Sequence, residues 1–201
     1  MRKANLMLKI LVVCPWLFLL AACNPLENDT KALSMLVIES LTGVDAEGNE
    51  GNFVQSDVQK IDKDTGQAYV TVDIGKANLT AKMLDPAPKM GVSPYADIEL
   101  TRYVVTYTRS DGKNTPGIDV PYPIEGSISA LVKVDVQTGV AVVVVKEVAK
   151  LEPPLINLVQ NRSEGVLNVT ARIDFYGHDL LNNNVKASGT MSIFFGNYFD
   201  K

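Results

Sequence analysis

Apolar and polar positions alternate along much of the chain after residue 33, and this alternation predicts β-strands. In residues 67–74 four apolar side chains alternate with polar or aromatic ones, the period-two pattern of a strand with one buried face. Gly75 and Lys76 then permit a turn, and residues 79–83 alternate again. The two segments are therefore predicted to form a hairpin.

The same pattern recurs in the middle of the chain. Residues 98–108 are rich in β-branched and aromatic side chains, with Tyr103, Val105 and Tyr107 on one face. Residues 128–136 alternate as a strand and lead through a Thr-Gly pair into residues 140–148, whose four consecutive valines suit burial on both faces. We predict a single strand followed by a second hairpin.

Two further strands are predicted over residues 166–176 and 185–195, on either side of a Gly- and Asn-rich turn at residues 177–184. Residues 154–161 are the one stretch that suggests a short helix. With about nine strands in all, the chain is predicted to be all-β, an antiparallel β-sandwich forming one domain over residues 33–201.

The segment Phe175 to Val185 resembles the closing hairpin of exported immunoglobulin-like modules. That resemblance implies an immunoglobulin-like or fibronectin-like sandwich and no particular activity. Such domains usually take ~100 residues, so this one is expected to be enlarged by long loops or extra strands.

The first 22 residues have the features of an export signal. Arg2, Lys3 and Lys9 precede an apolar stretch at residues 10–20, which is too short for a comfortable membrane span. It ends in Leu20-Ala21-Ala22-Cys23, which resembles the lipobox of bacterial lipoproteins. We expect residues 1–22 to be a cleaved signal peptide.

The lipobox resemblance implies that Cys23 becomes the mature N-terminus and carries a diacylglyceryl thioether, usually with an added N-acyl chain. Two or more acyl chains anchor a protein stably to a membrane, whereas a single acyl chain does not. Residues 23–32 are polar and Pro-containing and are predicted to be a lipidated tether. Asn24, where the inner-membrane retention signal has Asp, favours the outer membrane of the cell envelope.

Charge and ligand counts exclude several functions. The chain has 19 basic and 23 acidic residues and no basic cluster, so we exclude nucleic acid as a partner. Loss of Arg2, Lys3 and Lys9 with the signal leaves 16 basic residues against 23, a mature net charge of −7. With one histidine and two cysteines, Cys14 and Cys23, the chain lacks the ligands for multi-Cys/His zinc sites, haem attachment or iron–sulfur clusters, and we predict no cofactor.

His178 is the only side chain suited to proton transfer near neutral pH. It lies beside Asp179 in the predicted turn, and the chain has no Gly-x-Ser-x-Gly motif to supply a nucleophile. We interpret His178 as a solvated turn residue and predict no catalytic residue.

Two acidic segments offer oxygen ligands at alternate positions, as a calcium ion requires. Their candidate ligands are Asp45 and Glu47 in one segment and Asp62 and Asp64 in the other. Neither segment completes a helix–loop–helix calcium site, because the flanking helices and the bidentate glutamate are missing. The simpler interpretation is that both are hairpin turns.

Residues 110–123 form the least generic stretch, with three prolines and two glycines that should make the loop stiff. Rigid loops on a β-scaffold commonly make binding contacts, and Tyr122 would supply an anchor of low conformational entropy. The simpler alternative is a long crossover between two sheets, restrained by proline.

Two function classes fit these features. The first is a non-enzymatic, lipid-anchored envelope protein that acts as an accessory or binding module for a protein or glycan partner. The second is a lipid-anchored, carboxylate-dependent hydrolase of envelope polymers, which would need a polar cleft with facing carboxylates. The first requires only the sandwich and the anchor, and we favour it.

We predict that Cys23→Ser yields an unacylated protein that no longer fractionates with membranes, because the thioether sulfur is lost. Metabolic labelling with a fatty-acid analogue tests this. Undiminished label in the variant would contradict a lipid on Cys23.

Overall fold

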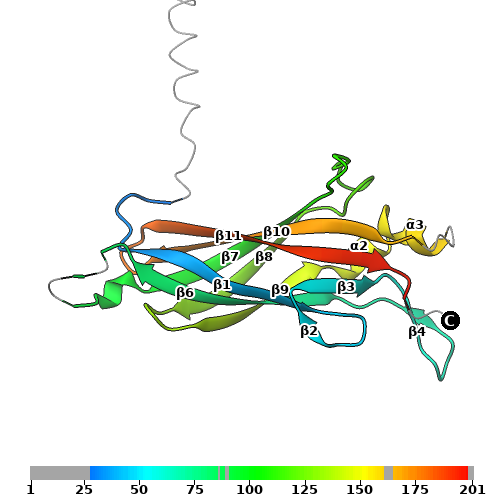
Figure 1. Ribbon diagram of the computed structural model, residues 1–201, viewed down its shortest axis with the longest axis horizontal. Helices are drawn as coiled ribbons and strands as arrows, with labels where there is room; N and C mark the ends of the chain where they lie inside the picture. The colour runs from blue at the N-terminus through cyan, green and yellow to red at the C-terminus, as the bar shows by residue number, and fades with distance from the viewer. Residues whose placement is uncertain (1–27, 86, 89–90, 161–164, 199–201) are drawn as a thin grey trace, which may run out of the picture.

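Two β-sheets packed face to face make up the fold in Figure 1, a computed structural model that describes residues 28–85, 87–88, 91–160 and 165–198. The four-stranded sheet has, in spatial order, β2 (Glu50–Gly51), β1 (Ser34–Val44), β6 (Asp73–Met83) and β9 (Thr138–Val145). The five-stranded sheet has β3 (Phe53–Asp57), β11 (Asn184–Gly196), β10 (Leu167–Asp179), β7 (Ile98–Thr108) and β8 (Ile124–Val132). The predicted all-β sandwich is confirmed.

Pairing within the sheets is antiparallel except that β3 runs parallel to β11. A separate small hairpin joins β4 (Lys60–Ile61) to β5 (Ala68–Tyr69). The core lies between the two sheets, where inward side chains alternate with outward ones. Tyr103, Val105 and Tyr107 of β7 all face this core, as the alternation predicts.

The hairpin predicted over residues 67–83 is wrong. Residues 73–83 form one continuous strand, β6, and the predicted turn residues Gly75 and Lys76 lie inside it. Gly75 is closely packed there, since a Cβ on it would lie 3.1 Å from Val144 Cγ1 and 3.4 Å from the Thr42 carbonyl oxygen. An isolated glycine in a strand often marks such a close approach rather than a turn.

The second predicted hairpin, over residues 128–148, is also wrong. β8 ends at Val132, and β9 belongs to the other sheet, where it pairs with β6. The chain crosses between the sheets at residues 133–137, where the Asp97 carboxylate accepts the Val134 N–H and Asp135 adopts a φ of 58°. Two alternating segments next to a turn do not by themselves show that the segments pair.

The closing hairpin of β10 and β11 is confirmed, but its strands are longer than predicted. Gly177, His178 and Asp179 belong to β10, and the turn is confined to residues 180–183. A Cβ on Gly177 would lie 2.3 Å from the Glu99 carbonyl oxygen, so this position requires glycine where β10 bends beside β7.

Helical structure is sparse. The predicted short helix is present as α3 (Leu155–Gln160), and it follows an unpredicted turn of helix, α2 (Glu147–Lys150). A short 3-10 helix, η2 (Pro94–Ala96), precedes β7. None of the helices in the described residues has the length and apolar character needed to cross a membrane.

A buried ion pair ties α2 to both sheets. The Lys150 side chain is fully buried, and its Nζ donates to Asp73 Oδ1 at 3.0 Å and to the Asp57 carbonyl oxygen at 2.9 Å. The Ser56 hydroxyl donates to the other Asp73 oxygen. Burial raises the pKa of the Asp73 carboxyl, and the neighbouring Lys150 ammonium opposes that rise. One lysine thus joins β3, β6 and the helix after β9.

We predict that Lys150→Met destabilises the fold by about 3–5 kcal/mol, because it leaves the Asp73 charge buried without its partner. The Asp73 pKa then rises further, so the folded state binds a proton that the unfolded state does not. Stability of the variant should therefore be greater at about pH 5 than at about pH 7, the opposite of a carboxylate with a lowered pKa. Denaturant titration at both pH values measures this.

The matched control is the double variant Lys150→Met/Asp73→Asn, which removes both charges and keeps an acceptor for Ser56. It should recover more than half of the lost stability. Equal destabilisation in the single and double variants would show that Lys150 acts by packing and not by pairing.

Candidate functional site

The loop of residues 109–123 joins β7 to β8 at one end of the sandwich and projects beyond the sheets at the upper right of Figure 1. β7 and β8 are neighbours in the same sheet. The alternative interpretation of this loop as a crossover between the two sheets is therefore wrong. It is a long extension of a hairpin, which leaves its residues available for other contacts.

Internal hydrogen bonds hold this loop in one shape. The Thr115 carbonyl oxygen accepts the N–H groups of Ile118 and Asp119, and the Asp119 carboxylate accepts the Thr115 N–H in return. At the base, the Asn114 side-chain oxygen accepts the Arg109 N–H at 2.6 Å. The stiffness predicted from the prolines is thus reinforced by polar contacts.

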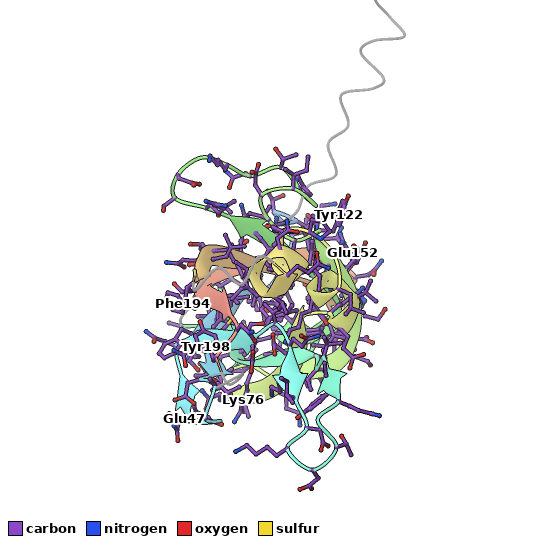
Figure 2. All side chains as sticks on the ribbon, turned by 90° about the vertical axis from the view of Figure 1, so that its right-hand side faces the viewer. Glu47, Lys76, Tyr122, Glu152, Phe194 and Tyr198 are labelled. Carbon is purple, nitrogen blue, oxygen red and sulfur yellow. The ribbon has the colours of Figure 1, made fainter. Side chains whose placement is uncertain are left out.

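Tyr122 and Ile118 are the two exposed large apolar side chains on this loop. Ile118 is 68% exposed and Tyr122 is 59% exposed. The Tyr122 ring lies on Gly117, where φ is +74° and an added Cβ would be 2.4 Å from the Tyr122 hydroxyl oxygen. One side of the ring therefore braces the loop while the rest faces solvent, and Figure 2 shows Tyr122 at the rim of this end.

His178 is not in a turn, contrary to the prediction. It lies within β10, between Glu99 of β7 and Asn184 of β11, on the outer face of the five-stranded sheet. Its Nδ1 is 3.1 Å from the Asp179 carbonyl oxygen, a contact in which the ring nitrogen is the donor. The Asp179 carboxylate is engaged by the turn that follows, so it does not orient the imidazole.

The four calcium candidates lie on two separate hairpins. Asp45 and Glu47 follow β1, while Asp62 and Asp64 lie between β4 and β5. The Asp45 carboxylate accepts bonds from the Asn49 side chain and from backbone N–H groups, and these hydrogen bonds hold its pKa below the usual value.

Asp62 serves its own turn in the same way. It accepts the backbone N–H groups of Thr65 and Asp64, which lower its pKa. Across the described part of the chain, no group of three or more His, Cys, Asp or Glu side chains converges to hold a metal ion. Asp45 and Asp62 each accept hydrogen bonds within their own turn. The carboxylates of the two segments do not converge on a shared site.

Two hollows lie on the surface formed by the described residues. One, of about 320 Å³, lies over β1, β6 and β9, and its lining includes Glu50 as the single carboxylate. The other, of about 560 Å³, lies where β1 meets β11, and its lining includes Glu39 as the single carboxylate. Neither hollow has the pair of facing carboxylates that the hydrolase alternative needs.

Sequence reasoning missed the cluster of Ser56, Asp73 and Lys150, whose side chains are of types used in catalysis. Ser56 and Lys150 are fully buried, and Lys150 donates to Asp73 and to a backbone carbonyl. A substrate has no access to either side chain. Nothing in the local sequence distinguishes Lys150 from the exposed lysines, so no signal could have revealed its burial.

The lipidation candidate Cys23 lies outside the described residues. Comparison with protein-family models, curated proteins and solved structures finds no match.

We predict that chelator and reductant leave the melting temperature of a fragment starting near Asn28 unchanged within a few degrees, because hydrogen bonds hold both acidic turns without a metal ion. Thermal melts followed by circular dichroism, with and without chelator, measure this. A large drop in chelator would instead indicate a calcium site, and Asp45→Ala and Asp62→Ala would then locate it.

Proposed function

We propose that this protein is a non-enzymatic, lipid-anchored module of the bacterial cell envelope, attached through Cys23 and presenting residues 109–123 to a protein or glycan partner. The observation that carries the proposal is a stiff hairpin extension with two exposed anchors, Ile118 and Tyr122. The lipobox-like segment supports the anchor, and Asn24 after the cysteine favours the outer membrane.

The preformed loop lowers the entropic cost of binding a partner. A loop already ordered by its own hydrogen bonds loses little conformational entropy when a partner covers it. Tyr122 has two side-chain torsions and is already placed against Gly117, so its ring is preorganised as well. Ile118, the most exposed large apolar side chain in the described residues, gains most from losing its contact with water.

The test is crosslinking of envelope partners in intact cells that carry the full chain. Tyr122→Ala and Ile118→Ser should each weaken partner recruitment. A fully desolvated tyrosine contributes ~2 kcal/mol or more, which corresponds to about a 30-fold loss of affinity. Tyr122→Phe keeps the ring on Gly117 and should retain most of the binding, so it separates the contribution of the ring from that of the hydroxyl group.

His178→Ala is the matched control, because His178 is part-buried on the outer face of β10, outside this loop. It should leave partner recruitment unchanged, and every variant should keep the melting temperature of the parent. Loss of a hydrolytic activity in His178→Ala, with normal partner capture by Tyr122→Ala, would replace the binding module with an enzyme.

A further inference from the structure

The chain enters the sandwich at the end opposite to residues 109–123. The Asp29 N–H donates to the Asn184 carbonyl oxygen at 2.8 Å, and the Asn28 side-chain oxygen accepts the Lys186 N–H at 2.7 Å. The segment expected as a tether is therefore already docked on the β10–β11 hairpin from residue 28. Only residues 23–27 separate this dock from the lipid expected on Cys23.

Covalent geometry then limits where the bilayer can be. The five residues from Cys23 to the dock at Asn28 span at most about 18 Å in any conformation. β10 alone has 13 residues, about 40 Å of extended chain. A lipid on Cys23 therefore brings the bilayer to the docked end and not to the far end of the sandwich, where residues 109–123 and α3 lie (Figure 1).

This docked end, which we call the tether end, is rich in exposed apolar side chains. They come from three segments that meet there: the residue after β6, the approach to β7 through η2, and the β10–β11 turn. The Leu180 N–H donates to the Tyr95 carbonyl oxygen, which joins two of these segments directly. The exposed apolar residues of the tether end are Leu84, Val92, Tyr95, Leu180 and Leu181.

A buried carboxylate makes the tether end rigid. Asp179 is fully buried and accepts the backbone N–H groups of Leu33 and Leu181 together with both donors of Asn183. Burial opposes ionisation of this carboxyl, but the hydrogen bonds from Asn183, Leu33 and Leu181 outweigh it and lower its pKa. The turn that carries Leu180 and Leu181 is thus held in a fixed position beside the tether.

We propose that the tether end rests on the lipid bilayer, with Leu180, Leu181 and Tyr95 at the boundary between headgroups and acyl chains, so that the sandwich stands end-on. The inference rests on the proposed lipid anchor at Cys23. Leucine and tyrosine are suited to this boundary, since tyrosine has an apolar ring and a polar tip. Because the mature chain would carry a net charge of −7, the proposed contact relies on apolar side chains and not on attraction of the whole domain to anionic lipid.

End-on contact gives the lipid anchor a second role. A flexible tether alone would let the domain tumble at the surface, whereas a tether plus an apolar contact fixes which end faces the membrane. The loop of residues 109–123 is then held about 40 Å from the bilayer, the length of the long strands, where a partner can reach it.

The test uses tryptophan fluorescence, because the only tryptophan of the chain is Trp16 in the signal peptide. Leu181→Trp and Tyr95→Trp each place one probe at the tether end of the mature protein, and Ile118→Trp places a matched probe at the far end. Each lipidated variant is reconstituted into phosphatidylcholine vesicles with and without brominated acyl chains. Circular dichroism confirms that each variant is folded.

We expect about twofold quenching of the two tether-end probes by brominated lipid and almost none at Ile118→Trp, because interfacial contact buries side chains about 5–10 Å into the boundary. Vesicle flotation without quenching of either tether-end probe would overturn the end-on contact and leave the lipid anchor standing. Quenching at both ends would overturn it in favour of a domain lying flat. Failure to float would overturn the anchor itself, and this inference with it.

Discussion

The buried pairing of Lys150 with Asp73 is the constraint on which the arrangement of this sandwich depends. A lysine without contact with water is tolerated only where its charge is compensated, and here the Asp73 carboxylate and the Asp57 carbonyl oxygen provide that compensation. The pair brings the helix after β9 against the start of β6 and the end of β3. Since these strands belong to different sheets, the Lys150 side chain links the two sheets at one end of the core.

The opposite end is closed by a different buried charge, Asp179, which gathers backbone N–H groups from the start of β1 and from the β10–β11 turn. The two ends therefore expose different sets of side chains. One receives the chain that leads to Cys23 and exposes apolar side chains beside it, while the other extends the hairpin that carries Ile118 and Tyr122. Long strands keep the two sets of side chains apart, so the proposed anchoring and the proposed binding would not compete for one surface.

The local pattern of apolar and polar residues predicted where strands lie better than it predicted which strands pair with one another. The inward face of β7 follows from alternation alone, and the closing hairpin follows from two alternating segments around a polar turn. Gly75 and Gly177 were predicted to be turn residues, but each lies inside a strand; a Cβ would be tightly packed at Gly75 and would clash with the Glu99 carbonyl oxygen at Gly177. A glycine in a strand-like segment indicates either a turn or a close contact that leaves little room for a side chain. Only the fold shows which of the two applies.

What the sequence determined by itself is what depends on neighbours along the chain: the period-two alternation and hence the all-β class, the short helix α3, and the stiffness of residues 110–123. The expectation of a lipid on Cys23 also rests on the sequence alone. The tertiary structure decided which strands share a sheet, the burial of Lys150, and the placement of Tyr122 and of the tether at opposite ends. The physical reason is that alternation states only that a strand has a buried face, whereas pairing and burial depend on complementary groups distant in the chain.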